Sequence, residues 1–304
     1  MYVLLIRSYL LIILKLSINE KDITKMKWYQ KLTLTIFAVL CCFSFTMCNK
    51  DDISDSASND ASSKQNSTKP EIQTTNQTEI NTTNITIIVE SEEPAPPEYF
   101  DDVVFVGDSI SESLRRYTSW LKDEQNIDYF GKAQFLTAAS FGIYNALVGE
   151  CLPVYKGERM PIEDNIVQMD VKKVYILLGL NDVARFSCEE NIQNYKELIN
   201  RILSKKPNLD IIIQSVTPLT RHEESLQYVN FDRAHVKTLN EALEKMADEN
   251  NFYFINVASA VMDDEGFLPN EYSYDGTCHM TYEALELWIN YMRTHTLKSV
   301  DVEI

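Results

Sequence analysis

The sequence predicts an α/β domain of three layers, in which a parallel sheet lies between helices on both faces. Short apolar runs of the length of buried strands recur from residue 99 onward, and segments with helical spacing of apolar residues lie between them. Strands that alternate with helices favour parallel pairing, because each helix carries the chain back to the start of the next strand. In sheets of this kind ligands bind at the carboxyl ends of the strands.

The expected strands and helices alternate along the chain. The predicted strands are Val103–Val106, Gln134–Ala139, Val174–Leu178, Ile211–Val216 and Phe252–Val257. The predicted helices are Ser111–Gln125, Pro161–Met169, Glu189–Lys205, Asn230–Asn250 and Thr281–Thr294. The last helix shows its pattern most clearly, because Ala284, Leu285, Trp288 and Met292 recur at helical spacing.

The charge of the chain argues against one class of partner. Its 304 residues carry a formal net charge of −17 at pH 7, so nucleic acids and anionic membrane surfaces would repel it. The six cysteines form neither a Cys-x-x-Cys pair nor a disulfide framework. We therefore expect no nucleic acid, no metal and no cofactor.

The first 48 residues have the features of a secretory signal or membrane anchor. A positive segment around Met26 and Lys31 precedes an apolar run over residues 32–47, and Cys48 follows. Met26 is a candidate for the true start of translation. The arrangement resembles a bacterial lipoprotein, which implies secretion and a lipid on Cys48 that anchors the protein to the outer face of the cytoplasmic membrane. Another cysteine of this region, plain secretion or an uncleaved anchor are the alternatives.

Residues 49–98 are predicted to form a disordered tether. They are rich in Ser, Thr, Asn and Asp and end in a segment with several prolines. Such a composition buries too little apolar surface to offset the entropy lost when the chain becomes ordered. The folded domain is therefore expected over residues 99–304.

The first motif that suggests chemistry is Gly107-Asp108-Ser109, directly after the first predicted strand. A tight turn from a strand into a helix exposes the serine hydroxyl, and backbone N–H groups at the helix start stabilise a developing negative charge. The tripeptide alone is a weak signal. Ser109 could equally be the cap of the helix that follows.

Two further motifs follow at the same expected edge of the sheet. Gly179-Leu180-Asn181-Asp182 comes after the third strand, and the Asn181 amide could either bind an oxyanion or form an ordinary turn. Asp275 and His279 precede the last helix. A nucleophilic serine needs a base to take its proton and a carboxylate to orient that base, so these residue types supply what Ser109 requires.

In their order, spacing and strand context over residues 99–297, the three motifs resemble blocks I, III and V of the SGNH (GDSL-like) hydrolases. The resemblance implies a flavodoxin-like sheet of order 2-1-3-4-5 and ester hydrolysis without a metal. It also implies roles for the residues. Ser109 attacks the acyl carbon, His279 is the base and Asp275 orients it, while the Ser109 N–H and the Asn181 side chain bind the oxyanion.

Two blocks depart from the family pattern. The family places a glycine after the second strand as third oxyanion donor. Gly142 could be that glycine after a small shift, whereas Ser140 fits the spacing better. In block V, Asp275 lies four residues before His279, where the family usually has three. The carboxylate then reaches the histidine only if the loop bulges, and a backbone carbonyl is the alternative partner.

Several functions are compatible with these motifs. The first is an esterase that removes acetyl or other short acyl groups from a small-molecule or glycan ester. Lysophospholipase, thioesterase or acyltransferase activity could use the same residues, because a fold and its triad do not fix the substrate. A non-catalytic surface binding domain of the same fold is the third. In each case the membrane is a partner only through the amino-terminal anchor.

Overall fold

The computed structural model describes residues 82–303. The predicted signal or anchor region, including Cys48, lies outside the described residues, as does the predicted tether as far as residue 81. The domain can therefore be compared with its prediction almost throughout.

A central sheet of five parallel strands confirms the predicted fold class. Its strands are β2 (Val103–Gly107), β3 (Gln134–Thr137), β6 (Lys173–Leu177), β7 (Asp210–Gln214) and β8 (Tyr253–Ile255). Their order across the sheet is β3-β2-β6-β7-β8, and all neighbours are parallel. Counted by sequence within this sheet, the order is 2-1-3-4-5, as the resemblance implies. The apolar runs of the sequence become strands that are covered on both faces.

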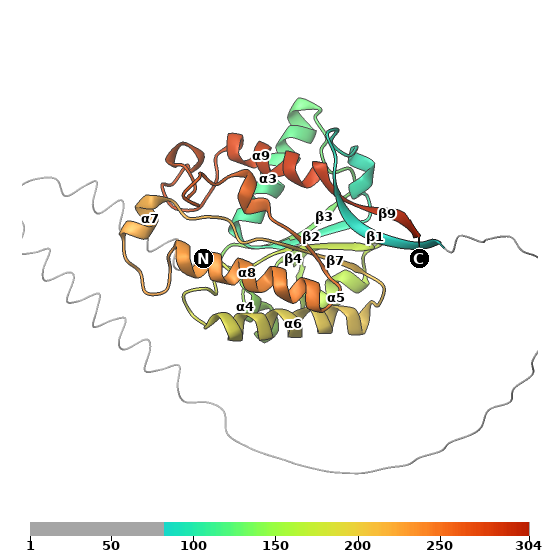
Figure 1. Cartoon of the computed structure of the whole chain (residues 1–304), viewed down its shortest axis with the longest axis horizontal. Helices are drawn as coiled ribbons and strands as arrows, with labels where there is room; N and C mark the ends of the chain where they lie inside the picture. The colour runs from blue at the N-terminus through green and yellow to red at the C-terminus, as the bar shows by residue number, and fades with distance from the viewer. Residues whose placement is uncertain (1–81, 304) are drawn as a thin grey trace, which may run out of the picture. The chain divides into compact units, whose positions relative to one another are not determined.

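Helices cover both faces of the sheet (Figure 1). On one face lie α3 (Ser109–Gln125) and α9 (Tyr282–Thr294), and on the other lie α4 (Ile143–Val148), α5 (Ile162–Val167), α6 (Cys188–Lys205) and α8 (Arg233–Glu249). The five predicted helices are all present, with ends shifted by a few residues. Two short helices, α4 and α7 (Arg221–Ser225), give too few turns for a periodic signal in the sequence.

Shorter elements complete the domain. They are the hairpin of β4 (Val154–Tyr155) with β5 (Glu158–Arg159), and the 3-10 helices η1 (Pro97–Phe100), η2 (Val257–Ala260) and η3 (Asn270–Tyr272). None of these was expected from the sequence, because each is too short for its pattern to be distinguished from a loop.

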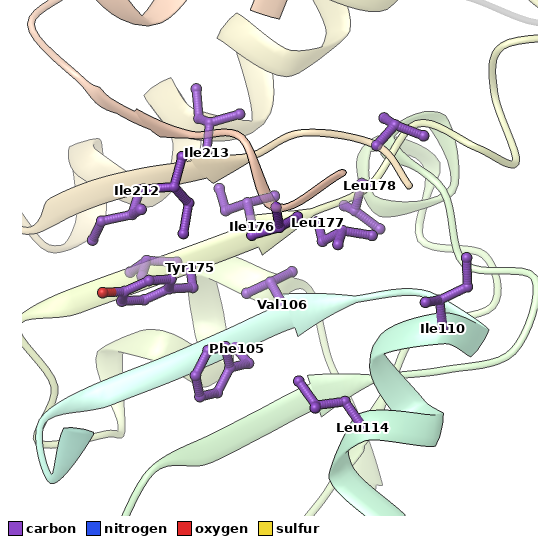
Figure 2. Packing of buried hydrophobic residues seen from close by; sticks show 14 of the residues in the cluster. Phe105, Val106, Ile110, Leu114, Tyr175, Ile176, Leu177, Leu178, Ile212 and Ile213 are labelled. Atoms are coloured by element: carbon purple, nitrogen blue, oxygen red, sulfur yellow. The ribbon is translucent and has the colours of Figure 1, made fainter. Parts of the chain in front are cut away.

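The core holds the carboxyl ends of the central strands in place. Figure 2 shows Phe105 of β2 beside Tyr175 of β6, and their ring centroids are 5.3 Å apart. Buried Trp288 of α9 donates from Nε1 to Gln214 Oε1 of β7 at 3.0 Å, which satisfies two polar groups inside the core. Because β2 and β6 are neighbours in this packed sheet, the loops that follow them lie at one edge.

A two-stranded antiparallel ribbon joins the two ends of the described chain. Strand β1 (Thr82–Glu90) pairs with β9 (His295–Glu303). Residues 82–98 therefore differ from the predicted tether, since they form ordered structure that ends in η1. The β-branched Thr, Ile and Val residues of β1 favour a strand, and Ile88 and Leu297 pack against the core. Composition alone does not reveal that β9 is available as a partner.

Candidate active site

Ser109 is the first residue of α3 and lies just beyond the carboxyl end of β2. The side chain of Asp108 caps the helix, since it accepts a hydrogen bond from the Ile110 amide at 2.9 Å. At Gly107 an added Cβ would overlap Ser111 Oγ, so only glycine fits there. Asp108 is thus the cap, and the Ser109 hydroxyl is available to another partner.

That partner is His279, which in turn contacts Asp275. Ser109 Oγ lies 2.9 Å from His279 Nε2, and His279 Nδ1 lies 2.6 Å from Asp275 Oδ2. A serine, a base and a carboxylate joined in this order have the geometry that nucleophilic catalysis requires. The His279 and Asp275 side chains keep 26% and 30% of their surface exposed, so the pair is open to solvent.

The four-residue spacing in block V does not separate Asp275 from His279. Gly276 adopts a left-handed conformation with φ of +77°, and Asp275 Oδ1 accepts hydrogen bonds from the Thr277 amide at 2.9 Å and from Ser273 Oγ at 3.1 Å. These contacts fold the loop so that the second carboxylate oxygen faces the ring. The structure therefore brings a side-chain carboxylate, not a backbone carbonyl, to His279 Nδ1.

The ionisation state of Asp275 determines which nitrogen of His279 carries the proton. Partial burial raises the pKa of Asp275, but hydrogen bonds from His279 and Thr277 lower it by more, to about 2. The carboxylate is ionised at neutral pH and accepts the Nδ1 proton of His279. This leaves the lone pair on Nε2, the nitrogen that faces Ser109.

Thr220, a buried residue outside all motifs, supports the loop that carries Asp275 and His279. Its amide donates to the Thr277 carbonyl at 2.9 Å, and its Oγ1 donates to the Gly276 carbonyl at 2.6 Å. Both acceptors are backbone atoms. The sequence does not single out Thr220 itself, because its contact is with a loop more than fifty residues away, although its place after the carboxyl end of β7 is a signal for the site.

Tyr274 covers the ring of His279. The two ring centroids are 5.8 Å apart at an interplanar angle of 30°, and Tyr274 is 64% exposed. Tyr274 thus lies over the histidine ring at the surface of the site. Its position next to Asp275 is the one signal in the sequence that could have drawn attention to it.

Asn181 lies beyond the end of β6, beside the turn that carries Ser109. Gly179, with φ of +124°, allows the chain to turn there. The Asn181 Nδ2 group donates to the Phe141 carbonyl at 3.1 Å and lies 3.4 Å from Asp108 Oδ2. One hydrogen of this amide is therefore well held, while the second makes only a long contact and can be offered to a ligand oxygen.

The two candidate backbone donors of block II differ in geometry. Ser140 is exposed, with φ of +58°, in a turn closed by a hydrogen bond from the Phe141 amide to the Ala138 carbonyl at 3.3 Å. The Ser140 N–H is not the donor of the hydrogen bond that closes this turn. The Phe141 carbonyl faces Asn181, so the trans peptide directs the Gly142 N–H away from that side chain. The geometry favours Ser140 over Gly142.

Gly142 is needed for a different reason. A Cβ at this position would lie 2.5 Å from Asp182 Oδ2. Asp182 is buried and accepts hydrogen bonds from the Ile143 amide at 2.8 Å and the Tyr144 amide at 3.1 Å, which holds the start of α4. Burial raises the pKa of Asp182, although these hydrogen bonds oppose the rise. Asp182 braces its turn, as Asp108 does at α3.

Cys278 is adjacent to His279 but is placed unsuitably for a nucleophile. Its Sγ lies 4.0 Å from Nδ1, the nitrogen that faces Asp275. Burial raises the pKa of the thiol to about 12, and the neutral thiol is not the nucleophilic form. The group that His279 can activate through Nε2 is therefore the Ser109 hydroxyl.

Other features of the described chain do not compete with this site. Within residues 82–303, no three His, Cys, Asp or Glu side chains gather closely enough to hold a metal ion. Two surface depressions have volumes of about 300 and 600 Å³. The first is lined by residues of α3 and β3 and the second by residues of β1 and α8, and Ser109 lines neither. The candidate site is defined by the hydrogen bonds among Ser109, His279 and Asp275.

The described domain is a three-layer α/β fold with a hydrogen-bonded serine, histidine and aspartate at the carboxyl edge of its sheet, an arrangement suited to ester hydrolysis. Residues 105–286 match the family described as GDSL-like Lipase/Acylhydrolase. This match covers more than half of the chain, which therefore belongs to that family and is a hydrolase of ester bonds.

Solved structures of similar fold come from several organisms. A GDSL-like lipase from Bacteroides thetaiotaomicron is 20% identical with a TM-score of 0.48, covering 64% of this chain and 86% of that one. A lipase/acylhydrolase from Enterococcus faecalis is 14% identical with a TM-score of 0.45, covering 62% and 91%. A carbohydrate esterase family 3 protein from Talaromyces cellulolyticus is 14% identical with a TM-score of 0.41, covering 62% and 92%.

No curated protein matches the sequence. Among residues 82–303, none of the helices has the length and apolar character needed to cross a membrane.

Proposed function

We propose that this chain is a secreted serine esterase that removes acetyl or other short acyl groups from carbohydrates. The observation that carries the proposal is the hydrogen-bonded chain from Ser109 Oγ through His279 to Asp275, with distances of 2.9 and 2.6 Å. Each group stands where a serine hydrolase needs it, and no further group is required to activate the serine.

The reaction has two halves. His279 Nε2 takes the Ser109 proton as Oγ attacks the acyl carbon, and the negative charge on the carbonyl oxygen is stabilised by the Ser109 and Ser140 amides and by Asn181 Nδ2. His279 then gives the proton to the leaving alcohol oxygen as the ester bond breaks. Water, deprotonated by the same nitrogen, attacks the acyl-serine, and the proton passes from Nε2 to Ser109 Oγ as the acyl–oxygen bond breaks and the carboxylic acid is released.

The exposure of the site supports a large substrate. The His279 and Asp275 side chains keep 26% and 30% of their surface exposed and Ser109 is partly buried, so an ester group on a polymer can reach the site. The amino-terminal signal and Cys48 support a position outside the cytoplasmic membrane, where such polymers occur. We include lipid attachment at Cys48 in the proposal. Loss of labelled fatty acid in Cys48→Ala would support it, and unchanged labelling would exclude this cysteine.

A fluorophosphonate probe tests the nucleophile directly. It should label the wild-type protein at Ser109, as read by peptide mass spectrometry, and Ser109→Ala should abolish the label. An unlabelled wild-type protein would favour the non-catalytic binding domain instead.

Acyl preference is tested with p-nitrophenyl esters of increasing chain length together with acetylated glycans. We expect acetate to be released fastest. Faster cleavage of long-chain esters such as palmitate would overturn the carbohydrate proposal and favour a lipase or lysophospholipase. Transfer of the acyl group to an added sugar in place of water would identify an acyltransferase.

The choice between the Ser140 and Gly142 amides needs a change that removes one N–H and keeps the backbone. Proline is unsuitable at position 140, because φ of +58° is incompatible with its ring. Replacing the amide by an ester at either position removes the donor alone. The ester at 140 should reduce kcat by about 10²- to 10³-fold, and the ester at 142 should not. The opposite result would assign the donor to Gly142.

A further inference from the structure

Three aromatic rings stack at the surface between α3 and α9, which lie on the same face of the sheet (Figure 1). The centroids of Tyr117 and Tyr282 are 4.5 Å apart with planes within 16°, and Trp120 lies 6.0 Å from Tyr282 with planes within 13°. Tyr117 is buried, whereas Trp120 and Tyr282 expose 45% and 60% of their surface. We name these three residues the aromatic platform.

The platform is held rigidly from below. The Tyr117 hydroxyl donates to Glu286 Oε1 at 2.7 Å, and the Tyr129 hydroxyl donates to Glu286 Oε2 at 2.9 Å. Both carboxylate oxygens are engaged, so the Tyr117 ring is fixed and supports Tyr282. Because the rings are already parallel in the free protein, less conformational entropy is lost when a ligand binds.

The platform lies on a path that begins at the nucleophile. Ser109, Ser113 and Tyr117 are four residues apart on α3, so they share one face of the helix, and Trp120 continues that face. From the rise of an α-helix, Trp120 lies about 16 Å along α3 from Ser109.

A further exposed ring lies beside the nucleophile. Tyr274 stacks on His279, whose Nε2 is 2.9 Å from Ser109 Oγ, and Tyr274 is 64% exposed. Tyr282 follows His279 by three residues at the start of α9. Exposed aromatic faces therefore extend from the reacting atoms toward Trp120, a distance that a few linked sugar residues can span.

The chemistry of this surface suits a sugar. A pyranose ring packs its C–H face on an aromatic ring, and its hydroxyl groups bond to charged side chains at the edge. Exposed Arg116 and Glu283 are the sequence neighbours of Tyr117 and Tyr282. The net charge of −17 disfavours an anionic polymer, and charged residues so close in the sequence disfavour a purely apolar ligand.

We propose that the aromatic platform binds the backbone of an uncharged polysaccharide, several sugar residues away from the one whose ester reacts at Ser109. The inference rests on the proposed esterase function and names a second contact on the same polymer. A chain held at the platform raises the local concentration of its ester groups at the nucleophile. The platform takes no part in bond making or breaking.

Affinity gel electrophoresis tests the binding without catalysis. The full chain carrying Ser109→Ala is run in gels that contain chemically acetylated xylan, glucomannan or glycol chitin. We expect retardation in at least one gel, and Trp120→Ala or Tyr282→Ala should weaken the affinity by up to about tenfold, the scale of one aromatic contact. Tyr228→Ala, which removes another exposed tyrosine from the segment after α7, is the matched control.

Three results would overturn the proposal. They are no retardation in any of the three gels, equal retardation of the platform variants and the control, and a lower sedimentation coefficient in Trp120→Ala. The last result would show that the rings bind another copy of the protein. Trp120→Phe keeps an aromatic face and should restore much of the affinity.

Kinetics separate the platform from the proposed function. In Trp120→Ala, kcat/KM for p-nitrophenyl acetate should equal that of the wild type, while KM for the retarding polysaccharide should rise up to about tenfold. An equal loss of kcat/KM on p-nitrophenyl acetate and on the polysaccharide would overturn the proposed role of the aromatic platform. A wild-type protein that cleaves neither ester but is still retarded would refute the esterase and keep the binding site.

Discussion

His279 is placed between a carboxylate and a hydroxyl, and its two nitrogens have different tasks. The Nδ1 side is held by Asp275 at 2.6 Å and the Nε2 side meets Ser109 at 2.9 Å. Because each contact needs a particular protonation state, a change that keeps the shape of a side chain and alters its charge is the most informative test.

Asp275→Asn removes the charge and keeps the size of the side chain. We expect kcat to fall by at least about tenfold, because an amide can hold the imidazole in the wrong tautomer. The matched control is Asp232→Asn, since Asp232 also contacts a histidine, His235 Nδ1, at 2.9 Å. Steady-state kinetics should show a loss only in the first variant. Wild-type turnover in Asp275→Asn would remove this residue from the mechanism.

Cys278 should be unreactive although it adjoins His279, the proposed base. Its raised pKa, about 12, leaves it as the neutral thiol at neutral and moderately alkaline pH. Iodoacetamide should therefore modify exposed Cys151 and spare Cys278, as measured by peptide mass spectrometry. Cys278→Ala should keep its turnover. Rapid alkylation of Cys278 with loss of activity would indicate a thiolate at the site.

The sequence reveals those site residues whose chemistry depends on their type. Ser109, His279 and Asn181 stand in recognisable surroundings, and the structure brings them to one edge of the sheet. Thr220 acts through its backbone contacts and Tyr274 through stacking, and both depend on neighbours distant in sequence. No local pattern encodes such contacts.

At the scale of elements, close packing in the turn between β3 and α4 leaves no space for a side chain at position 142. Gly142→Ala places a methyl group 2.5 Å from Asp182 Oδ2. The carboxylate then has to leave the Ile143 and Tyr144 amides, so we expect a loss of about 1–3 kcal/mol in the free energy of unfolding. Urea denaturation measures it. An unchanged free energy of unfolding would show that the start of α4 can shift to accommodate the methyl group.

The predicted and missed elements differ in length and in where their partners lie. The long helices and buried strands carry enough apolar residues for a clear period, and each is observed. Helices α4 and α7 are too short for that signal. Strand β1 was assigned to the tether because its Thr and Asn residues resemble a disordered composition, whereas its pairing with β9 depends on residues two hundred positions away.

At the scale of the whole molecule, Asp108 links stability to pH. Burial raises its pKa to about 6, against opposing hydrogen bonds from the Ile110 and Ser111 amides. A carboxyl group whose pKa is higher in the folded state stabilises the fold while it is protonated. That contribution is complete below its unfolded pKa, near 4, and is lost as the pH rises through about 6.

Asp108→Asn cannot ionise and should therefore gain stability relative to the wild type as the pH rises from about 4 to about 7, by at most about 3 kcal/mol. Urea denaturation at both pH values measures the difference. Asp232→Asn is the control, because slight burial is outweighed by hydrogen bonds from His235 that lower the pKa of Asp232, so its contribution is lost only below about pH 4 and should barely change over this range. If the difference in unfolding free energy between Asp108→Asn and the wild type did not vary with pH, the raised pKa of Asp108 would be contradicted.

The β1–β9 ribbon should contribute to the stability of the domain and not to its chemistry. Deletion of residues 82–90 removes the partner of β9 and uncovers Leu297, whose amide donates to the Tyr99 hydroxyl at 2.8 Å. Both the unfolding free energy and its urea dependence should fall, because less surface is exposed on unfolding. Deletion of residues 49–81 is the control. Equal unfolding curves for the two deletions would contradict this role.

The ribbon also fixes where the chain enters the domain relative to the reacting atoms. Glu90 pairs with His295 at the end of α9, and the start of α9 adjoins His279, so the helix length separates the entry strand from the reacting atoms by about 20 Å. The segment that precedes β1 therefore enters the domain at the end of α9 that is remote from Ser109. If the anchor proposed above exists, its attachment leaves the surface around Ser109 free for a polymer to approach.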